Sequence, residues 1–162
     1  MDHRTTDVVE RFLRYVRVHT TSESESTSLP STKQQFELAK ILVSELKEFG
    51  FVDASVDEHC VVSASLAPVG TDQPKIGLLA HLDTSPDSPG VNVNPMIRIV
   101  QQDKPIVLEK DEQVISFEDL KKYVGKEVIT TDGSTLLGAD DKAGVAILMA
   151  TAKRLTSDPN PT

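Results

Sequence analysis

Three segments of the chain repeat apolar residues at the three- and four-residue steps of an amphipathic helix. The first covers residues 7–18, and its apolar positions are Val8, Val9, Phe12, Leu13, Tyr15 and Val16. A second helix is predicted to start at Ser31 or Thr32, either of which can cap its N-terminus, and to end at Gly50, a typical C-terminal residue. A third amphipathic helix is predicted over residues 142–155.

Three segments after the second helix have the pattern of β-strands. Residues 52–56 and 60–66 alternate apolar and polar positions, whereas residues 76–80 form a continuous apolar run, which predicts a central strand of a covered sheet. The alternation of helices and strands predicts an α/β layer structure. Residues 20–28, almost all Ser, Thr and Glu, are expected to form a solvated loop, and residues 157–162 a second loop.

The segment between residues 84 and 126 interrupts this alternation, with prolines at four positions and a short helix candidate at 117–123. We interpret it as a long functional insertion. After it, residues 128–131 and 135–137 flank an Asp132-Gly133 turn signal and predict a compact hairpin.

Composition narrows the class of protein further. The 162 residues, 38% hydrophobic and 26% charged, suit one globular domain. The formal charge of −8 disfavours a nucleic-acid partner, and no apolar run reaches the roughly 18 residues of a membrane span, so no membrane partner is expected. One cysteine, Cys60, cannot form an internal disulfide, which fits a reducing compartment, and we expect a cytoplasmic protein.

A histidine and an aspartate follow directly after the apolar run of residues 76–80. Ligands of open α/β sheets bind at the carboxyl ends of strands. Side chains two residues apart on an extended chain share a face, so His81 and Asp83 are expected to face one cleft. A carboxylate at this range can orient an imidazole, as the partners of metal-bound histidines do. The same pair is compatible with a structural role, in which Asp83 starts a turn.

Two adjacent aspartates, Asp140 and Asp141, precede the last predicted helix. The helix N-terminus favours carboxylates, so one interpretation is an N-cap pair, which explains one aspartate better than two. Small residues on both sides allow a ligand to approach closely, and a carboxylate can bridge two divalent ions. Cap and metal ligand are both open interpretations from the spacing.

Together these motifs resemble the M20 family of zinc peptidases, in particular its tripeptide aminopeptidases. The matching stretches are residues 81–87, 92–95, 129–133 and 136–144. The resemblance runs from the first predicted helix to the last. It implies that residues 1–162 are the N-terminal portion of a zinc-exopeptidase-like, three-layer α/β/α catalytic domain, truncated before the lid domain. It also implies an intact enzyme that releases the N-terminal residue of tripeptides, with a small peptide as its substrate.

The resemblance further implies roles for single residues. His81 matches a histidine that binds one zinc ion, and Asp83 matches the catalytic aspartate that supports this histidine. Asp140 matches the carboxylate that bridges two zinc ions, whereas Asp141 is a helper at best. The peptide bond between Asp140 and Asp141 is expected to be cis, as is common in this family.

Other parts of the family pattern have no counterpart in these residues. Members have a general-base glutamate in a Glu-Glu pair, further acidic and histidine zinc ligands, and a lid domain that binds the peptide. Because a catalytic zinc normally needs three protein ligands and a water, the 162-residue chain alone is expected to be inactive. Exposed strand edges and apolar faces predict that it self-associates.

Two alternatives stand beside this interpretation. The chain could be a truncated, non-catalytic remnant with a binding or structural role. It could also belong to another M20 exopeptidase, such as a dipeptidase or a deacylase. Such an enzyme would keep His81, Asp83 and Asp140 but not the context of residues 84–87 and 92–95.

Overall fold

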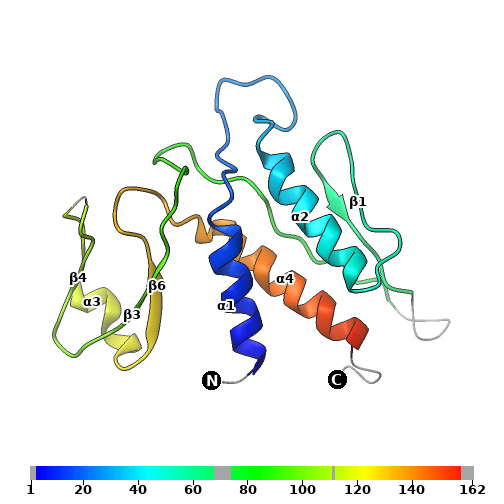
Figure 1. Cartoon of the computed structure of the whole chain (residues 1–162). Coiled ribbons are helices and arrows are strands. Elements are labelled where there is room, and N and C mark those ends of the chain that lie inside the picture. Colours follow the sequence, from blue (N-terminus) through cyan, green and yellow to red (C-terminus); the bar gives the residue numbers. More distant parts are fainter. Residues whose placement is uncertain (1–2, 68–73, 111, 158–162) are drawn as a thin grey trace.

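The computed structural model describes residues 3–67, 74–110 and 112–157, with the backbone alone for residues 3–6. Three helices form its larger part: α1 (His3–Tyr15), α2 (Gln35–Glu48) and α4 (Ala139–Ser157). Helix α4 packs against both α1 and α2 (Figure 1). None of the described helices has both the length and the apolar character that crossing a membrane requires.

The apolar faces predicted for these helices meet in one core. Its members include Phe12, Tyr15 and Val16 of α1, Leu38, Leu42 and Leu46 of α2, and Val145, Ala146 and Met149 of α4. The three predicted helices are therefore confirmed. The strands predicted at 52–56 and 60–66 are present in shorter form as the antiparallel pair β1 (Ser55–Val56) and β2 (Val62–Ser63), which lies beside α2.

The start of α2 differs from its prediction. Gln34 is the N-cap residue, in helical conformation and without a side-chain cap, so Ser31 and Thr32 do not cap the helix. Their hydroxyl groups are used elsewhere: Thr32 Oγ1 donates to the carbonyl of Thr21, and Ser31 Oγ accepts from the Glu23 amide. The predicted end is correct, because Gly50 follows the helix with a φ of +97°.

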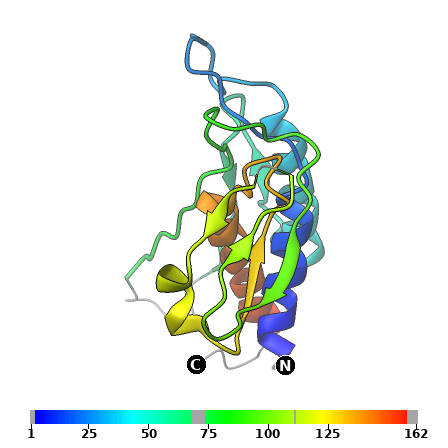
Figure 2. The same cartoon turned by 90° about the vertical axis from the view of Figure 1, so that its left-hand side faces the viewer.

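A smaller lobe lies beside the helices (Figure 1) and faces the viewer in Figure 2. In it β3 (Met96–Ile99) pairs with β6 (Glu127–Thr130), and β4 (Ile106–Val107) pairs with β5 (Val114–Ile115), both antiparallel. The helix predicted at 117–123 is confirmed as α3 (Phe117–Leu120) followed by the 3-10 turn η1 (Lys121–Tyr123). The lobe has its own small core of Val100, Ile106, Leu108 and Leu120. The predicted insertion covers residues 84–126. Strand β6 begins just after it, yet pairs with β3, which lies inside it.

The hairpin predicted from residues 128–131 and 135–137 is wrong. Strand β6 pairs instead with β3, in a register that runs from Met96 opposite Thr130 to Ile99 opposite Glu127. The Asp132-Gly133 turn is present, with the Gly133 amide donating to Thr131 Oγ1, but residues 135–137 form no strand. Turn chemistry indicated the reversal of the chain correctly, whereas the partner strand was more than 25 residues away in sequence.

The central strand predicted at residues 76–80 is also wrong. These residues form neither a helix nor a strand, and they join no sheet within the part of the chain that the structure describes. Ile76, Leu78 and Leu79 are 82%, 60% and 94% exposed. An apolar run shows that burial would be favourable but does not specify the segment that covers it.

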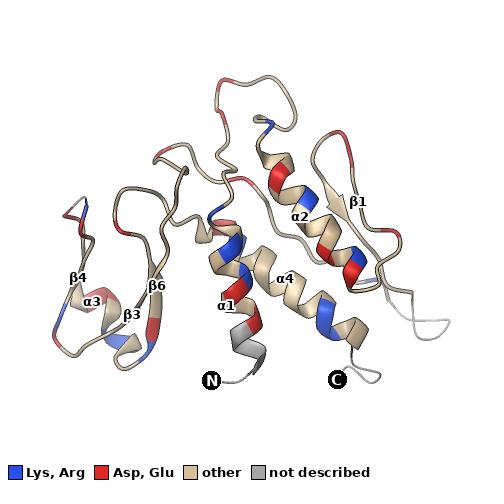
Figure 3. Cartoon of the chain, in the orientation of Figure 1, with Lys and Arg blue, Asp and Glu red and all other residues tan. Residues whose placement is uncertain are grey.

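The combination of helices and small sheets is compatible with the predicted α/β class, although every described strand pair is antiparallel. The 20–28 stretch is a loop as predicted, with Thr20 as a fully buried exception. Residues 158–162, the end of the second predicted loop, lie outside the described residues. Charged residues of both signs occur along the helices and in the small lobe (Figure 3).

Candidate functional site

His81 stands between two aspartates contributed by different parts of the chain. Its Nδ1 atom lies 3.0 Å from Asp83 Oδ1 and 3.0 Å from the Asp83 carbonyl oxygen. Its Nε2 atom lies 3.0 Å from Oδ1 of Asp140, which is 59 residues further along the chain. The extended backbone places His81 and Asp83 on one side, as predicted, and the start of α4 brings Asp140 to the opposite edge of the ring.

The adjacent aspartates at the start of α4 have different structural roles. Asp141 Oδ1 accepts a hydrogen bond of 3.2 Å from the Gly144 amide, as an N-cap carboxylate does. Asp140 points instead to His81, and its side chain is 96% exposed. The peptide bond between them is cis, as expected, and both residues have non-helical backbone angles. The N-cap interpretation therefore explains Asp141 and leaves Asp140 free for another function.

Two glycines allow this arrangement of the backbone. Gly138 has a φ of +75°, and an added Cβ would lie 3.0 Å from the methyl group of Thr84. At Gly144 an added Cβ would lie 2.3 Å from Oδ1 of Asp141. A larger residue at position 138 would therefore strain the backbone next to Asp140, and one at position 144 would push the Asp141 carboxylate away from the helix N-terminus.

The contacts around His81 favour its charged form. Both ring nitrogens face oxygen acceptors, so the protonated ring donates to Asp83 from Nδ1 and to Asp140 from Nε2. Partial burial alone would lower the pKa of His81. The hydrogen bond from Asp140 and the charge and hydrogen bonds of Asp83 outweigh it, and the pKa is raised above its ordinary value.

The donor atoms of this arrangement fit zinc chemistry. Imidazole nitrogen and carboxylate oxygen are both common zinc ligands, and His81 Nε2 and Asp140 Oδ1 face each other across 3.0 Å. A metal ion would displace the proton between them, while Asp83 would hold the proton on Nδ1. Among the described residues, no group of three or more His, Cys, Asp or Glu side chains is placed to hold a metal ion. His81 and Asp140 therefore fit as two ligands of a zinc site that needs further ligands.

Sequence reasoning missed two buried residues next to the site. Thr84, adjacent to Asp83, is 3% exposed, and Lys142, two residues after Asp140, is 2% exposed. Lys142 Nζ donates a 2.7 Å hydrogen bond to the carbonyl of Val18, and burial lowers the pKa of Lys142 to about 8. Lysine is rarely buried, so the sequence offered no local signal for this contact.

A cavity of about 510 Å³ lies between the site loops and the small lobe. Ser88 and Pro89, which follow Asp83 in sequence, and Leu136 and Leu137, which precede Asp140, contribute to its wall. The Leu136 amide donates to the Pro89 carbonyl at 2.9 Å and so joins the two site loops. The site has two halves, His81 with Asp83 on one loop and Asp140 on the other. The cavity wall thus includes residues from both of these loops.

The fold of the chain is similar to that of a solved structure. A crystal structure of a tripeptidase from Staphylococcus aureus matches 96% of this chain and 33% of its own chain, with a TM-score of 0.57 and 22% sequence identity. At this identity the likeness concerns the fold alone. No protein-family model matches the chain.

Comparison of the sequence found closer relatives. The chain is 49% identical over 160 residues to peptidase T of Alkaliphilus oremlandii, and 47% identical over 159 residues to peptidase T of Geobacillus thermodenitrificans. Both alignments cover 94% of this chain, but it spans only 39% and 38% of the lengths of these relatives. The chain is therefore a homologue of peptidase T that corresponds to less than half of its relatives' length.

Proposed function

We propose that the chain is the N-terminal portion of the catalytic domain of a zinc-dependent tripeptide aminopeptidase. The observation that carries the proposal is the arrangement of Asp83, His81 and Asp140, with 3.0 Å contacts on both sides of the imidazole ring. The similarity to peptidase T supports the reaction and a small peptide as the substrate. The fold likeness to a tripeptidase supports the domain type.

In the proposed enzyme, His81 Nε2 and Asp140 would hold zinc. Bound zinc would supply activation of a water molecule for attack on the first peptide bond of the substrate. Asp83 fixes the imidazole orientation and keeps the proton on Nδ1, so that Nε2 presents its lone pair. Asp140, as the resemblance implies, would bridge two ions with its two oxygens, and Asp141 would keep the loop in place as the helix cap.

The domain organisation is part of the same proposal. Residues 1–162 would form part of a three-layer α/β/α catalytic domain, with 84–126 as an insertion within it and a lid domain elsewhere in the intact enzyme. The general-base glutamate and the remaining zinc ligands would also lie in parts of the relatives that this chain does not span. The free cysteine Cys60, which is buried, fits the proposed cytoplasmic location.

The proposal implies that the 162-residue chain alone does not hydrolyse tripeptides. Two zinc ligands without a general base cannot complete a catalytic site, because such sites use three protein ligands and an activated water. We expect no zinc-dependent release of the N-terminal residue from trialanine by the purified chain. Turnover that Asp140→Ala abolishes, in a preparation free of full-length peptidase, would contradict this expectation.

Zinc binding tests the site itself. Isothermal titration of the chain with zinc is expected to show one weak site that His81→Ala and Asp140→Ala each remove. His59→Ala is the matched control, because His59 is an exposed histidine beside Glu58 and far from the site in sequence. Equal binding by wild type, His81→Ala and Asp140→Ala would overturn the site assignment.

The two alternatives make different predictions. A non-catalytic remnant would be encoded by a reading frame that ends at Thr162, which the mass of the protein in its source cells would show. A dipeptidase or deacylase of the same family would share the site residues, and the full-length enzyme would then prefer dipeptides or acylated amino acids over tripeptides.

A further inference from the structure

We infer that residues 18–22, here called the bracket segment, set the separation between His81 and Asp140 by holding the neighbours of both. This inference rests on the proposed function, because it gives Ser22 and Lys142 positioning roles for the proposed zinc ligands. It starts from a contrast in burial. The side chains of His81 and Asp140 are 51% and 96% exposed, so packing around them does little to fix their separation.

The bracket segment holds the first half of the site through the residue next to Asp83. The Thr84 amide donates to the Thr20 carbonyl at 3.1 Å, and the Ser22 amide donates to the Thr84 carbonyl at 2.9 Å. Ser22 Oγ donates a further bond of 3.0 Å to the same carbonyl. Thr21 and Thr84 thus form a parallel β-bridge. Thr20 and Thr84 are 0% and 3% exposed, so the bond between their backbones is shielded from water.

The same segment holds the second half of the site through Lys142. The Lys142 ammonium donates a 2.7 Å hydrogen bond to the Val18 carbonyl, which lies just beyond the end of α1. Lys142 is buried and only two residues from Asp140. Val18 contacts Lys142, whereas Thr20 and Ser22 contact Thr84. Because these contacts come from one stretch of five residues, a shift of the bracket segment alters the position of Asp83 relative to Asp140.

The bracket segment is itself anchored on its far side. Thr32 Oγ1 donates a 2.8 Å hydrogen bond to the Thr21 carbonyl, and Gln35 Nε2 at the start of α2 donates to Thr32 Oγ1 at 3.0 Å. Gly90 approaches so closely that an added Cβ would lie 2.2 Å from Thr21 Oγ1. The position of the segment is therefore defined from three sides, and Gly90 is required by this contact rather than by a turn.

Three variants test the inference without changing a proposed ligand. Lys142→Met removes the bond to Val18, Gly90→Ala forces the Thr21 hydroxyl to move, and Ser22→Ala removes one hydroxyl while keeping the backbone bridge. Matched controls are Lys153→Met, at a lysine of α4 whose ion pair with Asp7 lies outside the bracket segment, Gly77→Ala, where an added Cβ meets no atom within 4 Å, and Ser24→Ala in the exposed loop.

The first readout is zinc affinity measured by titration calorimetry. We expect Lys142→Met and Gly90→Ala to weaken zinc binding by about 10- to 100-fold, the usual effect of losing a residue that orients a metal ligand. Ser22→Ala should weaken it less, and Ser22→Thr, which keeps the hydroxyl, should restore it. Wild-type affinity in all three variants, with circular dichroism showing each to be folded, would overturn the inference.

The second readout needs no metal and separates this inference from the proposed function. In amide NMR spectra of the metal-free chain, Ser22→Ala is expected to shift the Asp140 and Asp141 resonances, although Ser22 bonds to the other half of the site. Ser24→Ala should leave them unchanged. If the wild-type chain binds no zinc but these shifts occur, the proposed function is wrong and the inference about the bracket segment is supported. If zinc binds but Ser22→Ala shifts neither resonance, the inference about the bracket segment is wrong.

Discussion

Asp83 controls the charge of the His81 ring through a hydrogen bond and its own negative charge. Both effects raise the pKa of His81 against the opposing effect of partial burial. We therefore expect Asp83→Asn to lower the pKa of His81, measured by NMR titration of the ring protons. Asp87→Asn, an exposed aspartate bonded to Ser85, is the control. An unchanged His81 pKa in Asp83→Asn would contradict the orientation of the ring described above.

Asp132, in the turn after β6, makes the stability of the fold depend on pH. Hydrogen bonds from the hydroxyl and amide of Ser134, and the ammonium of Lys110 at 3.0 Å, hold the pKa of Asp132 well below its ordinary value. Because the pKa of Asp132 is lower in the folded chain than in the unfolded chain, its ionised carboxylate stabilises the fold at any pH above the unfolded pKa. This stabilisation is lost as the pH falls toward the folded pKa.

The corresponding prediction compares urea unfolding at pH 7 and at about pH 3, below the unfolded aspartate pKa of about 3.9. Wild type should lose more stability over this range than Asp132→Asn, which lacks the titrating group. Asp103→Asn, in an exposed turn of the small lobe, should behave as wild type. Equal acid sensitivity in wild type and Asp132→Asn would show that the Asp132 contacts do not stabilise the fold.

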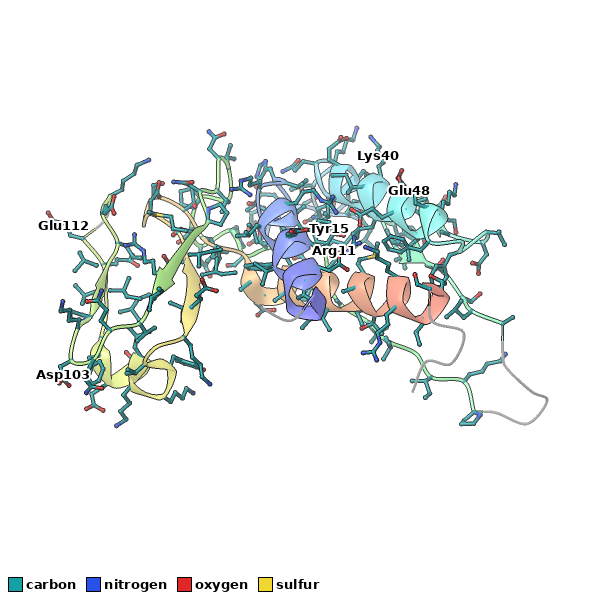
Figure 4. All side chains as sticks on the ribbon, turned by 60° about the horizontal axis from the view of Figure 1, so that its bottom comes forward. Arg11, Tyr15, Lys40, Glu48, Asp103 and Glu112 are labelled. Atoms are coloured by element: carbon teal, nitrogen blue, oxygen red, sulfur yellow. The ribbon has the colours of Figure 1, made fainter. Side chains whose placement is uncertain are left out.

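At the scale of elements, a buried ionic cluster joins α1 to α2. Arg11 and Arg14 both pair with Glu45, and Tyr15 donates a 2.8 Å hydrogen bond to the same carboxylate. Arg11 and Tyr15 lie together on α1 (Figure 4). Burial above all raises the pKa of Tyr15 to about 12, so the phenol remains a donor at neutral pH.

Glu45→Gln is expected to destabilise the fold by about 3 kcal/mol or more, because removing one partner leaves the buried Arg11 guanidinium without its main counter-charge. Glu37→Gln breaks an exposed pair with Lys40 on the same helix and should cost at most about 0.5 kcal/mol. Urea unfolding followed by circular dichroism measures both. A similar cost for the two variants would mean that the cluster contributes no more than a surface pair.

At the scale of the whole molecule, apolar surface is left uncovered. Residues 76–79 expose Ile76, Leu78 and Leu79, and a groove of about 330 Å³ lies among α1, β6 and α4, lined by Val8, Val9, Phe12, Ile129, Leu137, Ala139, Ala143 and Ile147. Extended backbone without a partner strand is a template for pairing with another chain. The net charge of −8 opposes association but cannot satisfy unpaired backbone groups.

We therefore expect concentration-dependent self-association of the isolated chain, measured by light scattering. Leu79→Lys should reduce it, because Leu79 is 94% exposed within the unpaired segment. Val52→Lys makes the same change of charge at a residue that is 95% exposed but lies outside this segment, and should have little effect. A strictly monomeric wild-type chain with slow amide exchange at residues 76–80 would contradict the prediction.

Local patterns in the sequence determined the helices and the placement of His81 beside Asp83. A helix has contacts at three- and four-residue steps, so the apolar positions of α1, α2 and α4 carry the information for their own formation. His81 and Asp83 are likewise two residues apart on one extended segment. The cis bond and the role of Asp140 came from the family resemblance and not from spacing.

Only the tertiary structure decided which distant segments meet. The pairing of β6 with β3, the exposure of residues 76–80 and the burial of Thr20 all depend on segments far away in the sequence, and hydrophobic periodicity does not encode partners. The 3.0 Å contact between His81 and Asp140 belongs to the same class. Backbone carbonyls of the bracket segment help to hold this contact in place. Because every residue has a carbonyl, no sequence pattern could have singled out those of Val18 and Thr20.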